Sequence, residues 1–465
     1  MYAPVDATVI ERLQAIVGSA YVLTDRERLE PYSHDEVPEL HAWPDVVVKP
    51  ATAEEISAIL KLANEMNVPV TPRGAGQGLS GGAVPVCGGI VLSVERMNRI
   101  LEIDHRNMMV TVEPGVITGE LHRAVEAEGL FYPPDPASLD SCFIGGNIAE
   151  GAGGPRAVKY GTTKDYVCGL EVVLPSGEIV KLGGKLVKDV MGYNLVQLMV
   201  GSEGTLGIVT KIILRLLPLP KAQVDLLVPY EDFQDAADTV AAIIAQSLIP
   251  TTIEFMDQAS IKAAERLLNK EVPFHDAAAH LLIQLTGTRQ EDLENDLDVV
   301  GEVCLDHGAL DVLVAQDRPT RDRLWEARRS LIEAMNNESP INHTEDVSVP
   351  RSEIPALIKG VRALGEELGL ATCCFGHAGD GNVHVNFLKY DLPDDLWAER
   401  TAEAQRRLYD LALSLGGTIT GEHGIGAIRK EYLRHAMGDS LVEIMRQIKL
   451  AFDPNRILNP GKIVP

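Results

Sequence analysis

Short apolar runs and one amphipathic stretch organise the first part of the chain. Residues 46–50 and 68–72 are apolar runs that end in proline. Between them, Ile56 and Ile59 begin an apolar stripe at helical spacing, and Thr52 fits the N-cap of a capping box. This pattern predicts a strand, a helix and a strand. Further apolar runs between Pro-Gly and Ser-Gly turns predict strands at residues 89–93, 108–113, 170–174 and 208–214. The first half is therefore expected to be mixed α/β.

The pattern changes after residues 217–220, whose Leu-Pro-Leu-Pro sequence is typical of a linker. Single apolar runs now alternate with longer amphipathic stretches. Strands are expected at residues 224–228, 252–255, 281–285 and 309–314, and helices near residues 235–246, 260–268, 291–306 and 323–335. Such alternation predicts an antiparallel sheet with its helices on one face.

Residues 372–388 form a predicted hairpin around a Gly-Asp-Gly-Asn turn. This hairpin would bring His377 and His384 close together, and the dipeptide Glu422-His423 follows some forty residues later. Neutral imidazoles and one carboxylate can hold Zn²⁺, Mn²⁺ or Fe²⁺ and leave a position open for substrate. A hydrogen-bonded core position remains the alternative for either hairpin histidine taken alone.

Residues 73–82 contain five glycines, which allow backbone N–H groups to approach a bound anion. The spacing is neither that of a Rossmann fingerprint nor that of a P-loop. Two more glycine clusters, at residues 144–154 and 201–208, follow in the same half. Each alone is equally compatible with an ordinary turn. Together they suggest a long, phosphate-bearing cofactor lying across several loops.

Length and charge exclude several classes of protein. At 465 residues, two or three domains are expected. The net charge of −25, from 67 acidic and 42 basic residues, disfavours nucleic acid and anionic membranes as partners. Six cysteines without Cys-x-x-Cys spacing indicate neither a disulfide framework nor an iron–sulfur cluster. No apolar stretch approaches the ~20 residues of a membrane span, and the first residues lack a basic leader with an apolar core, so a cytoplasmic protein is expected.

With these motifs assembled, the chain resembles the FAD-linked oxidase family of the vanillyl-alcohol oxidase fold. Its branch contains glycolate oxidase catalytic subunits, D-lactate dehydrogenases and D-2-hydroxyglutarate dehydrogenases. The similarity runs nearly from end to end. The strings that carry it are residues 72–78, 133–136, 145–147, 192–195, 201–207, the hairpin with His377 and His384, residues 421–424 and residues 458–462.

The resemblance implies an α+β architecture in three parts. Residues 1–220 would form the FAD-binding domain, and residues 221–415 a substrate or cap domain with an antiparallel sheet and the metal hairpin. Residues 416–465 would pack back on the FAD domain and complete the active site.

By the same resemblance the cofactor is FAD, with its pyrophosphate on the backbone of the first glycine loop. The implied cofactor-binding residues are Arg73, Gly74, Ala75, Gly76, Gln77, Gly78, Ser80, Pro134, Asp135, Ser138, Gly145, Gly146, Asn147, Tyr160, Gly161, Glu203, Ile208 and Asn459. Relatives that attach flavin covalently often use a histidine in this loop. Gln77 stands there instead, so non-covalent FAD is expected.

For the substrate half, the family pattern implies a metal on His377, His384 and Glu422, with Zn favoured and Mn or Fe as alternatives. His423 would be the general base, taking the hydroxyl proton of a D-2-hydroxy acid while the α-hydride passes to flavin N5. Arg328 would bind the substrate carboxylate. Without the resemblance, Arg328 reads as a surface-helix arginine. Asn386 matches a substrate-contacting position.

The expected substrate is a monocarboxylate such as D-lactate or glycolate, with D-2-hydroxyglutarate as the alternative. Relatives that act on 2-hydroxyglutarate carry a lysine shortly before a Val-Pro segment, whereas this chain has Thr344-Glu-Asp-Val-Ser-Val-Pro. An acid there would repel a second carboxylate.

Electrons from reduced FAD must leave for a partner, since the chain shows no nicotinamide fingerprint or iron–sulfur ligands. The candidates are an acceptor protein or a quinone, with a separate iron–sulfur subunit that would place the enzyme at the inner membrane. A homo-oligomer stays open. Two rival functions also stay open, a metal-dependent hydrolase and a flavin electron-transfer subunit without its own turnover.

Overall fold

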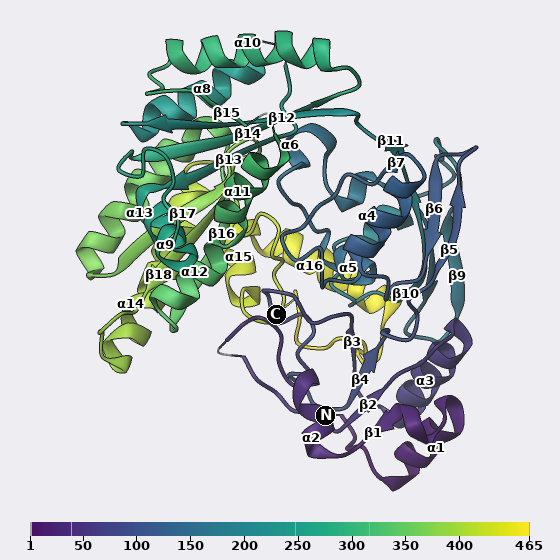
Figure 1. The fold of residues 1–465 in the computed structure, drawn as a ribbon. Coiled ribbons are helices and arrows are strands. Elements are labelled where there is room, and N and C mark those ends of the chain that lie inside the picture. Colours follow the sequence, from purple (N-terminus) through teal and green to yellow (C-terminus); the bar gives the residue numbers. More distant parts are fainter. Residues whose placement is uncertain (1, 39, 247, 316, 465) are drawn as a thin grey trace. The chain divides into compact units, whose positions relative to one another are not determined.

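The computed structural model describes residues 2–38, 40–246, 248–315 and 317–464. These residues divide into two compact units, each formed by segments that are distant in sequence (Figure 1). Unit 1 comprises Met1–Gly153, Thr162–Leu219 and His423–Pro465, and unit 2 comprises Gly154–Gly161 and Pro220–Glu422. One division therefore falls between Glu422 and His423.

Unit 1 begins with a four-stranded sheet in the order β1-β2-β4-β3. Its strands are β1 (Val22–Leu23), β2 (Val46–Val48), β4 (Ile90–Ser93) and β3 (Val70–Arg73), and the last three run parallel. Helix α3 (Ala53–Met66) connects β2 to β3, as the sequence predicts. Thr52 caps this helix by accepting from the Glu55 amide at 3.2 Å, but the Glu55 carboxylate accepts from the Ala51 amide and so does not close a capping box.

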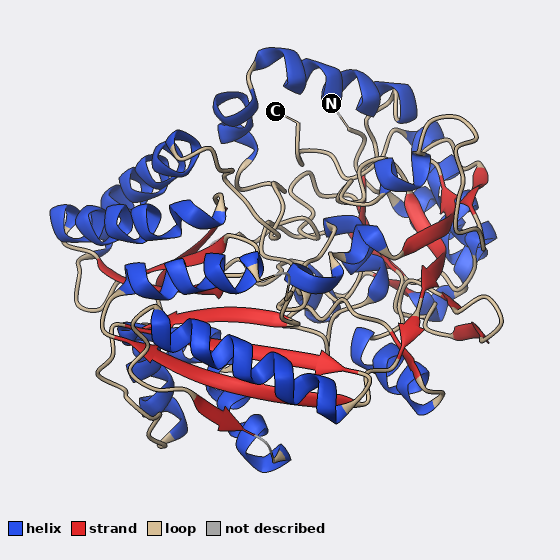
Figure 2. Cartoon of the chain, turned by 90° about the horizontal axis from the view of Figure 1, so that it is seen from above, coloured by secondary structure: helices blue, strands red, loops and turns tan. Residues whose placement is uncertain are grey.

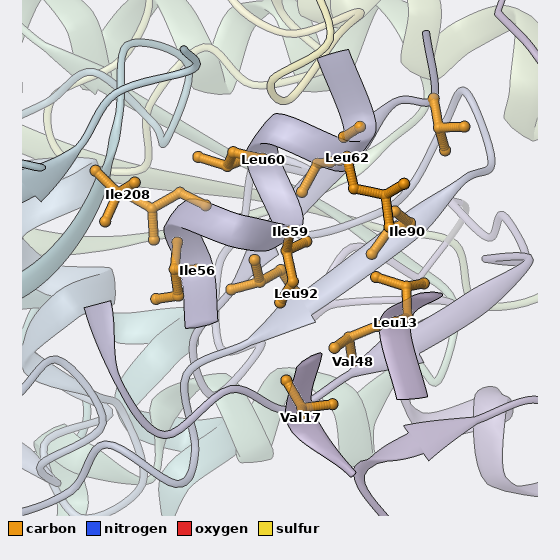
Figure 3. Packing of buried hydrophobic residues seen from close by; sticks show 14 of the residues in the cluster. Leu13, Val17, Val48, Ile56, Ile59, Leu60, Leu62, Ile90, Leu92 and Ile208 are labelled. Atoms are coloured by element: carbon orange, nitrogen blue, oxygen red, sulfur yellow. The ribbon is translucent and has the colours of Figure 1, made fainter. Parts of the chain in front are cut away.

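Aliphatic side chains from α1 (Ala7–Val17), α3 and this sheet form the hydrophobic core of unit 1. Ile56, Ile59 and Leu60 of α3 are fully buried, as is Leu92 of β4. Figure 3 shows these residues meeting between the helices and the sheet. Burial of this stripe, at roughly 1.5–3 kcal/mol for each large aliphatic side chain, holds the helix against the strands.

A second, five-stranded sheet of unit 1 is antiparallel, with the order β5-β6-β10-β8-β9. Its strands are β5 (Ile100–Asp104), β6 (Met109–Val112), β10 (Ile208–Arg215), β8 (Val167–Val173) and β9 (Ile179–Gly183). The C-terminal segment returns to unit 1, where Leu458 bridges to Val70 beside β3. The remaining helices of unit 1 are α2 (Arg26–Leu29), α4 (Thr118–Ala127), α5 (Ile144–Glu150), α7 (Leu195–Met199), α15 (Leu433–Met437) and α16 (Asp439–Phe452).

Unit 2 is built on a seven-stranded antiparallel sheet, which the sequence pattern predicts. In spatial order its strands are β15 (Leu313–Ala315), β12 (Ala222–Tyr230), β14 (Ala279–Gly287), β13 (Thr252–Asp257), β17 (Ala371–His377), β18 (Asn382–Leu388) and β16 (Asn342–Ser348). Strands β17 and β18 form the predicted hairpin, closed by Gly381 at φ 92°.

Helices cover both faces of this sheet, so the prediction of one helical face is wrong (Figure 2). On one face lie α8 (Phe233–Ala245), α10 (Gln290–Asp306), α13 (Ile354–Leu368) and α14 (Asp394–Ser414). On the other lie α9 (Gln258–Leu268), α11 (Arg318–Arg329) and α12 (Leu331–Glu338). The physical reason is that the central strands are buried on both sides: every residue of β13 is buried.

Three further elements differ from expectation. The helix predicted at residues 323–335 is two helices, α11 and α12, which meet at Ser330. The strand expected at residues 309–314 is confined to β15. Within the expected linker, Leu217–Pro218 forms a short strand, β11, that pairs with β7 (Leu130–Phe131). Among the described helices, none combines the length and the apolar character that a membrane crossing requires.

Candidate active site

One face of the seven-stranded sheet carries polar side chains at neighbouring positions of four strands. Residues that pair across strands share a face. Glu254 of β13 pairs with His377 of β17, while Phe375 of β17 pairs with His384 of β18, which in turn pairs with Asp346 of β16. These side chains therefore lie on the face that α9, α11 and α12 cover in part.

His377 and His384 both direct their Nε2 atoms at the carboxylate of Glu422. The Nε2–Oε1 distances are 3.4 Å and 3.6 Å, and the imidazole rings are nearly perpendicular at 85°. One atom from each of the three residues lies within 4.8 Å of the others. A tetrahedral ion with bonds of about 2.0–2.1 Å separates its ligands by about 3.3 Å, so this donor set fits a divalent metal. The structure thus brings together the three predicted ligands within unit 2.

The Glu254 carboxylate holds His377 by its Nδ1 atom. Glu254 was not predicted as a site residue from the sequence pattern. Its Oε1 lies 2.7 Å from His377 Nδ1, on the side of the ring away from Glu422. Burial lowers the pKa of His377, but the charges of Glu254 and Glu422 outweigh burial and raise it well above its ordinary value. A carboxylate on Nδ1 fixes the tautomer that leaves Nε2 available to a metal.

Asp346 organises the loop that carries Glu422. Its Oδ2 accepts from the Thr420 hydroxyl at 3.0 Å and from the Gly421 and Glu422 amides, both at 2.9 Å. Its Oδ1 lies 3.6 Å from His384 Nδ1. Burial raises the pKa of Glu422, whereas the hydrogen bond and charge of His377, with the charge of His384, bring it down to about 2.

Arg328 is buried on the same face and is not a surface residue. Only 9% of it is exposed, and its Nη2 lies 2.6 Å from Glu254 Oε2. The guanidinium also lies over the ring of Phe375, 5.1 Å from the centroid. Its Nε has no hydrogen-bond partner among the described residues. Arg328 is therefore held in place by Glu254 and keeps one donor that no described residue uses.

Of the two acids that follow Thr344, only Asp346 lies on the site face, where it holds the Glu422 loop. Glu345 points to the opposite face, where it accepts from Tyr409 and Gln405 at 2.7 Å each, so the expectation of repulsion is wrong for this residue. The Thr344 hydroxyl donates to Asn386 Oδ1 at 2.8 Å. Asn386 also donates to the backbone of β17 at 3.3 Å, so its amide is already engaged within the sheet.

In unit 1 the first glycine loop is suited to bind an anion. None of the backbone amides of residues 74–80 donates a hydrogen bond to any of the described residues. The Ser80 hydroxyl is fully buried and also has no hydrogen-bond partner among the described residues. Amide donors that no described residue uses fit the pyrophosphate of a dinucleotide.

The side chains around this loop stabilise its shape. Arg73 donates to the carbonyls of Pro31 and His34 at 2.8 Å and 2.7 Å. Any side chain at Gly76, where φ is 81°, would collide with the Arg73 guanidinium. Gln77 donates to Glu36 and accepts from Ser141, so its amide links two neighbouring segments.

Several predicted cofactor residues have structural contacts of their own in unit 1. Asn459 donates to Gly82 O at 3.1 Å and to Glu203 O at 2.7 Å, and thereby joins the C-terminal segment to two glycine loops. Ile208 is 3% exposed, and its side chain packs in the hydrophobic core of unit 1 (Figure 3). Asn147 donates to Thr118 at 2.7 Å.

The other predicted residues fall in both units. Unit 1 contains Ala75, Gly78, Pro134, Asp135, Ser138 and Gly145. Tyr160 and Gly161 belong to unit 2, where the Tyr160 hydroxyl lies 3.4 Å from the Thr286 hydroxyl. His423 is the first residue of the last segment of unit 1, directly after Glu422.

Comparison with known proteins agrees with this architecture. Residues 44–183 match the family described as FAD binding domain, and residues 219–463 match FAD linked oxidases, C-terminal domain. Among solved structures, p-cresol methylhydroxylase with substrate bound has a TM-score of 0.81 at 20% identity, covering 98% of this chain and 96% of that one. Alkyldihydroxyacetonephosphate synthase has a TM-score of 0.78 at 19% identity, covering 99% and 86%. The vanillyl-alcohol oxidase fold predicted from the sequence is confirmed.

Curated relatives are similar over nearly their whole length. Glycolate oxidase subunit GlcD of Bacillus subtilis is 46% identical over 93% of this chain and 91% of its own. D-lactate dehydrogenase of Anaerostipes hadrus is 40% identical over 99% and 98%, and D-2-hydroxyglutarate dehydrogenase of Stutzerimonas stutzeri is 34% identical over 98% and 99%. Fold and family matches together define an FAD-linked oxidoreductase. The chain belongs to the FAD-linked oxidase family.

Proposed function

We propose that this protein is an FAD-dependent dehydrogenase that oxidises a D-2-hydroxy monocarboxylic acid, D-lactate or glycolate, to the 2-oxo acid. The observation that carries the proposal is the arrangement in unit 2, where two imidazoles and a carboxylate converge beside a buried arginine with an unused donor. The relatives named glycolate oxidase subunit and D-lactate dehydrogenase support this substrate class.

Each group has one role in the proposed reaction. Arg328 binds the substrate carboxylate and fixes the orientation of the neighbouring hydroxyl-bearing carbon. His377, His384 and Glu422 would hold a divalent ion, which would supply Lewis acidity at that hydroxyl. His423 accepts the hydroxyl proton on an imidazole nitrogen. FAD supplies the two-electron acceptor for the hydrogen that leaves the substrate carbon with its electron pair.

The supporting shell keeps these groups in position. Glu254 orients both His377 and Arg328, so one carboxylate sets the metal ligand and the substrate clamp together. Asp346 fixes the loop of Glu422 through three hydrogen bonds. Asn386 contributes mainly through the sheet, since Thr344 and Cys373 already occupy its amide.

For the cofactor, we propose non-covalent FAD on unit 1, with the amides of residues 74–80 at the pyrophosphate and Ser80 as a further donor. Gln77 offers no atom for covalent attachment. In this proposal residues 1–220 bind FAD, residues 221–415 bind the substrate and the metal, and residues 416–465 complete the site. Zinc is the proposed metal because its ligands are two nitrogens and one carboxylate oxygen, and manganese and iron remain compatible.

A monocarboxylate is favoured over 2-hydroxyglutarate because the site face offers one buried arginine and a neutral Thr344. A second carboxylate would find no cationic partner at Thr344. The name of the relative GlcD as a subunit supports a partner protein as electron acceptor, which we propose to be a separate iron–sulfur subunit. A quinone is the alternative acceptor.

The test is anaerobic mixing of the purified yellow protein with D-lactate, glycolate, L-lactate and D-2-hydroxyglutarate. D-lactate or glycolate should bleach the flavin band near ~450 nm in one rapid phase, and L-lactate should leave it unchanged. Elemental analysis of the same preparation should find about one divalent ion per chain. A colourless protein would favour the hydrolase, and a yellow protein that no hydroxy acid bleaches would contradict the proposal and favour an electron-transfer subunit.

A further inference from the structure

Unit 1 contains a cluster of buried charged groups that the proposed reaction does not use. Asp35, Glu203, Arg429 and Lys462 are each between 1% and 6% exposed, and Glu150 joins them with an Oε2 that solvent does not reach. These five side chains come from distant parts of the sequence. Three acids and two bases leave an excess negative charge inside the unit, unless one acid carries a proton.

The Glu203 carboxylate accepts two backbone hydrogen bonds, as an ionised carboxylate does. Its Oε1 accepts from the Ile425 amide at 2.8 Å and its Oε2 from the Gly426 amide at 2.7 Å. Two backbone N–H donors stabilise the charged form of a carboxyl. The Glu203 backbone lies in the left-handed region at φ 49°, a conformation that residues with a side chain rarely adopt.

Glu150 stands close to Glu203 but has no such donors among the described residues. It ends α5, and its Oε2 has no hydrogen-bond partner there. A side chain at Gly424 would collide with this oxygen and would lie 3.0 Å from Glu203 Oε1, so both carboxyls border the same point. The other Glu150 oxygen lies against Gly82 of the first glycine loop. Glu150 is therefore enclosed between the glycine loop and the C-terminal turn.

An ionised carboxylate in this place would have a shielded, unpaired oxygen beside a second anion, which is unfavourable. A protonated acid avoids that cost and can donate to the neighbouring anion. We propose that Glu150 is a neutral carboxylic acid in the native protein and, paired with the anion Glu203, fastens the Gly424–Gly426 turn to the cofactor-binding loops.

The electrostatic surroundings agree with this assignment. Burial raises the pKa of Glu150 well above its ordinary value, and the charges of Glu203 and Asp35 raise it further against the opposing charges of Arg429 and Lys462. Burial also raises the pKa of Glu203, but the Ile425 and Gly426 amides oppose it. The proton therefore resides on Glu150.

The pair positions part of the proposed active site. Gly424 directly follows His423, so the Glu203 hydrogen bonds to the next two amides fix the path of the chain at the proposed base. This consequence rests on the proposed function, whereas the protonation state of Glu150 does not. Glu150 and Glu203 are thus positioning residues that act through the turn.

Infrared spectroscopy of the holoprotein at pH 8 tests the assignment directly. A protonated carboxyl absorbs apart from carboxylates, and this band should be present in the wild type and lost in Glu150→Gln. Asp35→Asn is the matched control, because the Asp35 pKa of about 6 leaves it ionised at this pH. A wild-type spectrum without the band, or one that Glu150→Gln leaves intact, overturns the proposal.

Thermal unfolding tests the energetic consequence without substrate. Since the folded pKa of Glu150 is raised, the wild type loses stability as pH rises above the ordinary range of a glutamate, and Glu150→Gln does not. The Tm of the glutamine variant minus that of the wild type should grow with pH, while Glu150→Leu, which lacks a donor, should unfold earlier at every pH. A difference between glutamine and wild type that stays flat from about pH 5 to 9 contradicts the proposal.

Enzyme kinetics test separately whether the pair positions the Gly424–Gly426 turn. Glu150→Leu should lower kcat and change its pH profile, because the chain at His423 is displaced, and glutamine should restore the wild-type profile. If glutamine fails to restore it while the infrared band behaves as expected, the positioning role is wrong and the protonation state stands. If no variant or wild type turns over hydroxy acids, the proposed function fails, and the infrared and thermal results still decide the protonation.

Discussion

Glu254 and Arg328 form an ion pair in the interior of unit 2, with 2.6 Å between Oε2 and Nη2 and with Glu254 fully buried. The same carboxylate holds His377 through its other oxygen at 2.7 Å. Removing a buried carboxylate that has two cationic or polar partners is costly, because both partners are then left buried without a counter-charge or hydrogen-bond acceptor. One acid thus links the proposed substrate clamp to the proposed metal ligand.

Glu254→Gln should weaken metal binding by roughly 10–100-fold, because the neutral amide holds the His377 tautomer less firmly. Chelator competition followed by elemental analysis measures this affinity, and flavin absorbance should show unchanged FAD. Asp225→Asn is the control, since Asp225 is a fully buried carboxylate of the same sheet that bonds Gln284. Equal metal affinity in both variants would mean that Glu254 serves only to stabilise the fold.

Arg328→Lys should lower kcat/KM for D-lactate by roughly 10–100-fold, mainly through KM. Lysine keeps the charge but loses the planar pair of donors, and a hydrogen bond to a charged group contributes about 1.5–3 kcal/mol. Steady-state kinetics measure the effect. The neighbouring Arg329 is exposed, so Arg329→Lys should leave KM within about twofold, and a similar loss in both variants would argue against the clamp.

His423→Ala should lower kcat by roughly 10²–10⁴-fold while FAD and metal remain bound. The loss follows because the substrate hydroxyl has no proton acceptor when the carbon is oxidised. Rapid mixing without oxygen measures the reductive step alone. A flavin that is reduced at the wild-type rate in this variant would remove His423 from the role of base.

Thr344→Lys should raise the ratio of kcat/KM for D-2-hydroxyglutarate to that for D-lactate by roughly tenfold or more. The side chain faces the site beside Asn386, and an ammonium there would pair with the distal carboxylate of the longer substrate. Thr344→Met adds length without charge and is the matched control. The idea fails if methionine and lysine change the ratio equally.

Asp35→Asn should make stability less dependent on pH. Burial raises the Asp35 pKa from an ordinary 3.8 to about 6, which corresponds to about 3 kcal/mol. Because the folded value is the higher one, the wild type loses this stability as pH rises from about 4 to about 6, and the variant does not. Denaturant unfolding at several pH values measures the difference, which should grow over that interval and then level off.

The hairpin was predictable, and the glycine-bearing turn with the alternation of β17 and β18 sets His377 and His384 on one face. Glu254 and Asp346 were not predicted as site residues. A useful signal was present in residues 252–255, where one acid interrupts an apolar strand and has to find a buried partner.

The placement of helices on both faces of the sheet could also have been predicted in part from the sequence. Residues 281–285 are nearly all apolar, a pattern typical of a strand buried on both faces, and this contradicts helices on a single face. The break between α11 and α12 at Ser330 carries no proline or glycine, so tertiary packing against α9 decides it. The pairing of Glu150 with Glu203 was not predictable from the sequence, because the two residues are far apart in the chain and meet only in the folded unit.

The return of the last segment to unit 1 sets an order of events during synthesis. Leu458 bridges Val70, and Lys462 donates to the carbonyls of Gly81 and Val84, so the first glycine loop lacks these neighbours until residues 458–462 have left the ribosome. The seven-stranded sheet is translated earlier and can assemble first. Capture of the flavin is therefore expected only after residues 458–462 have joined unit 1.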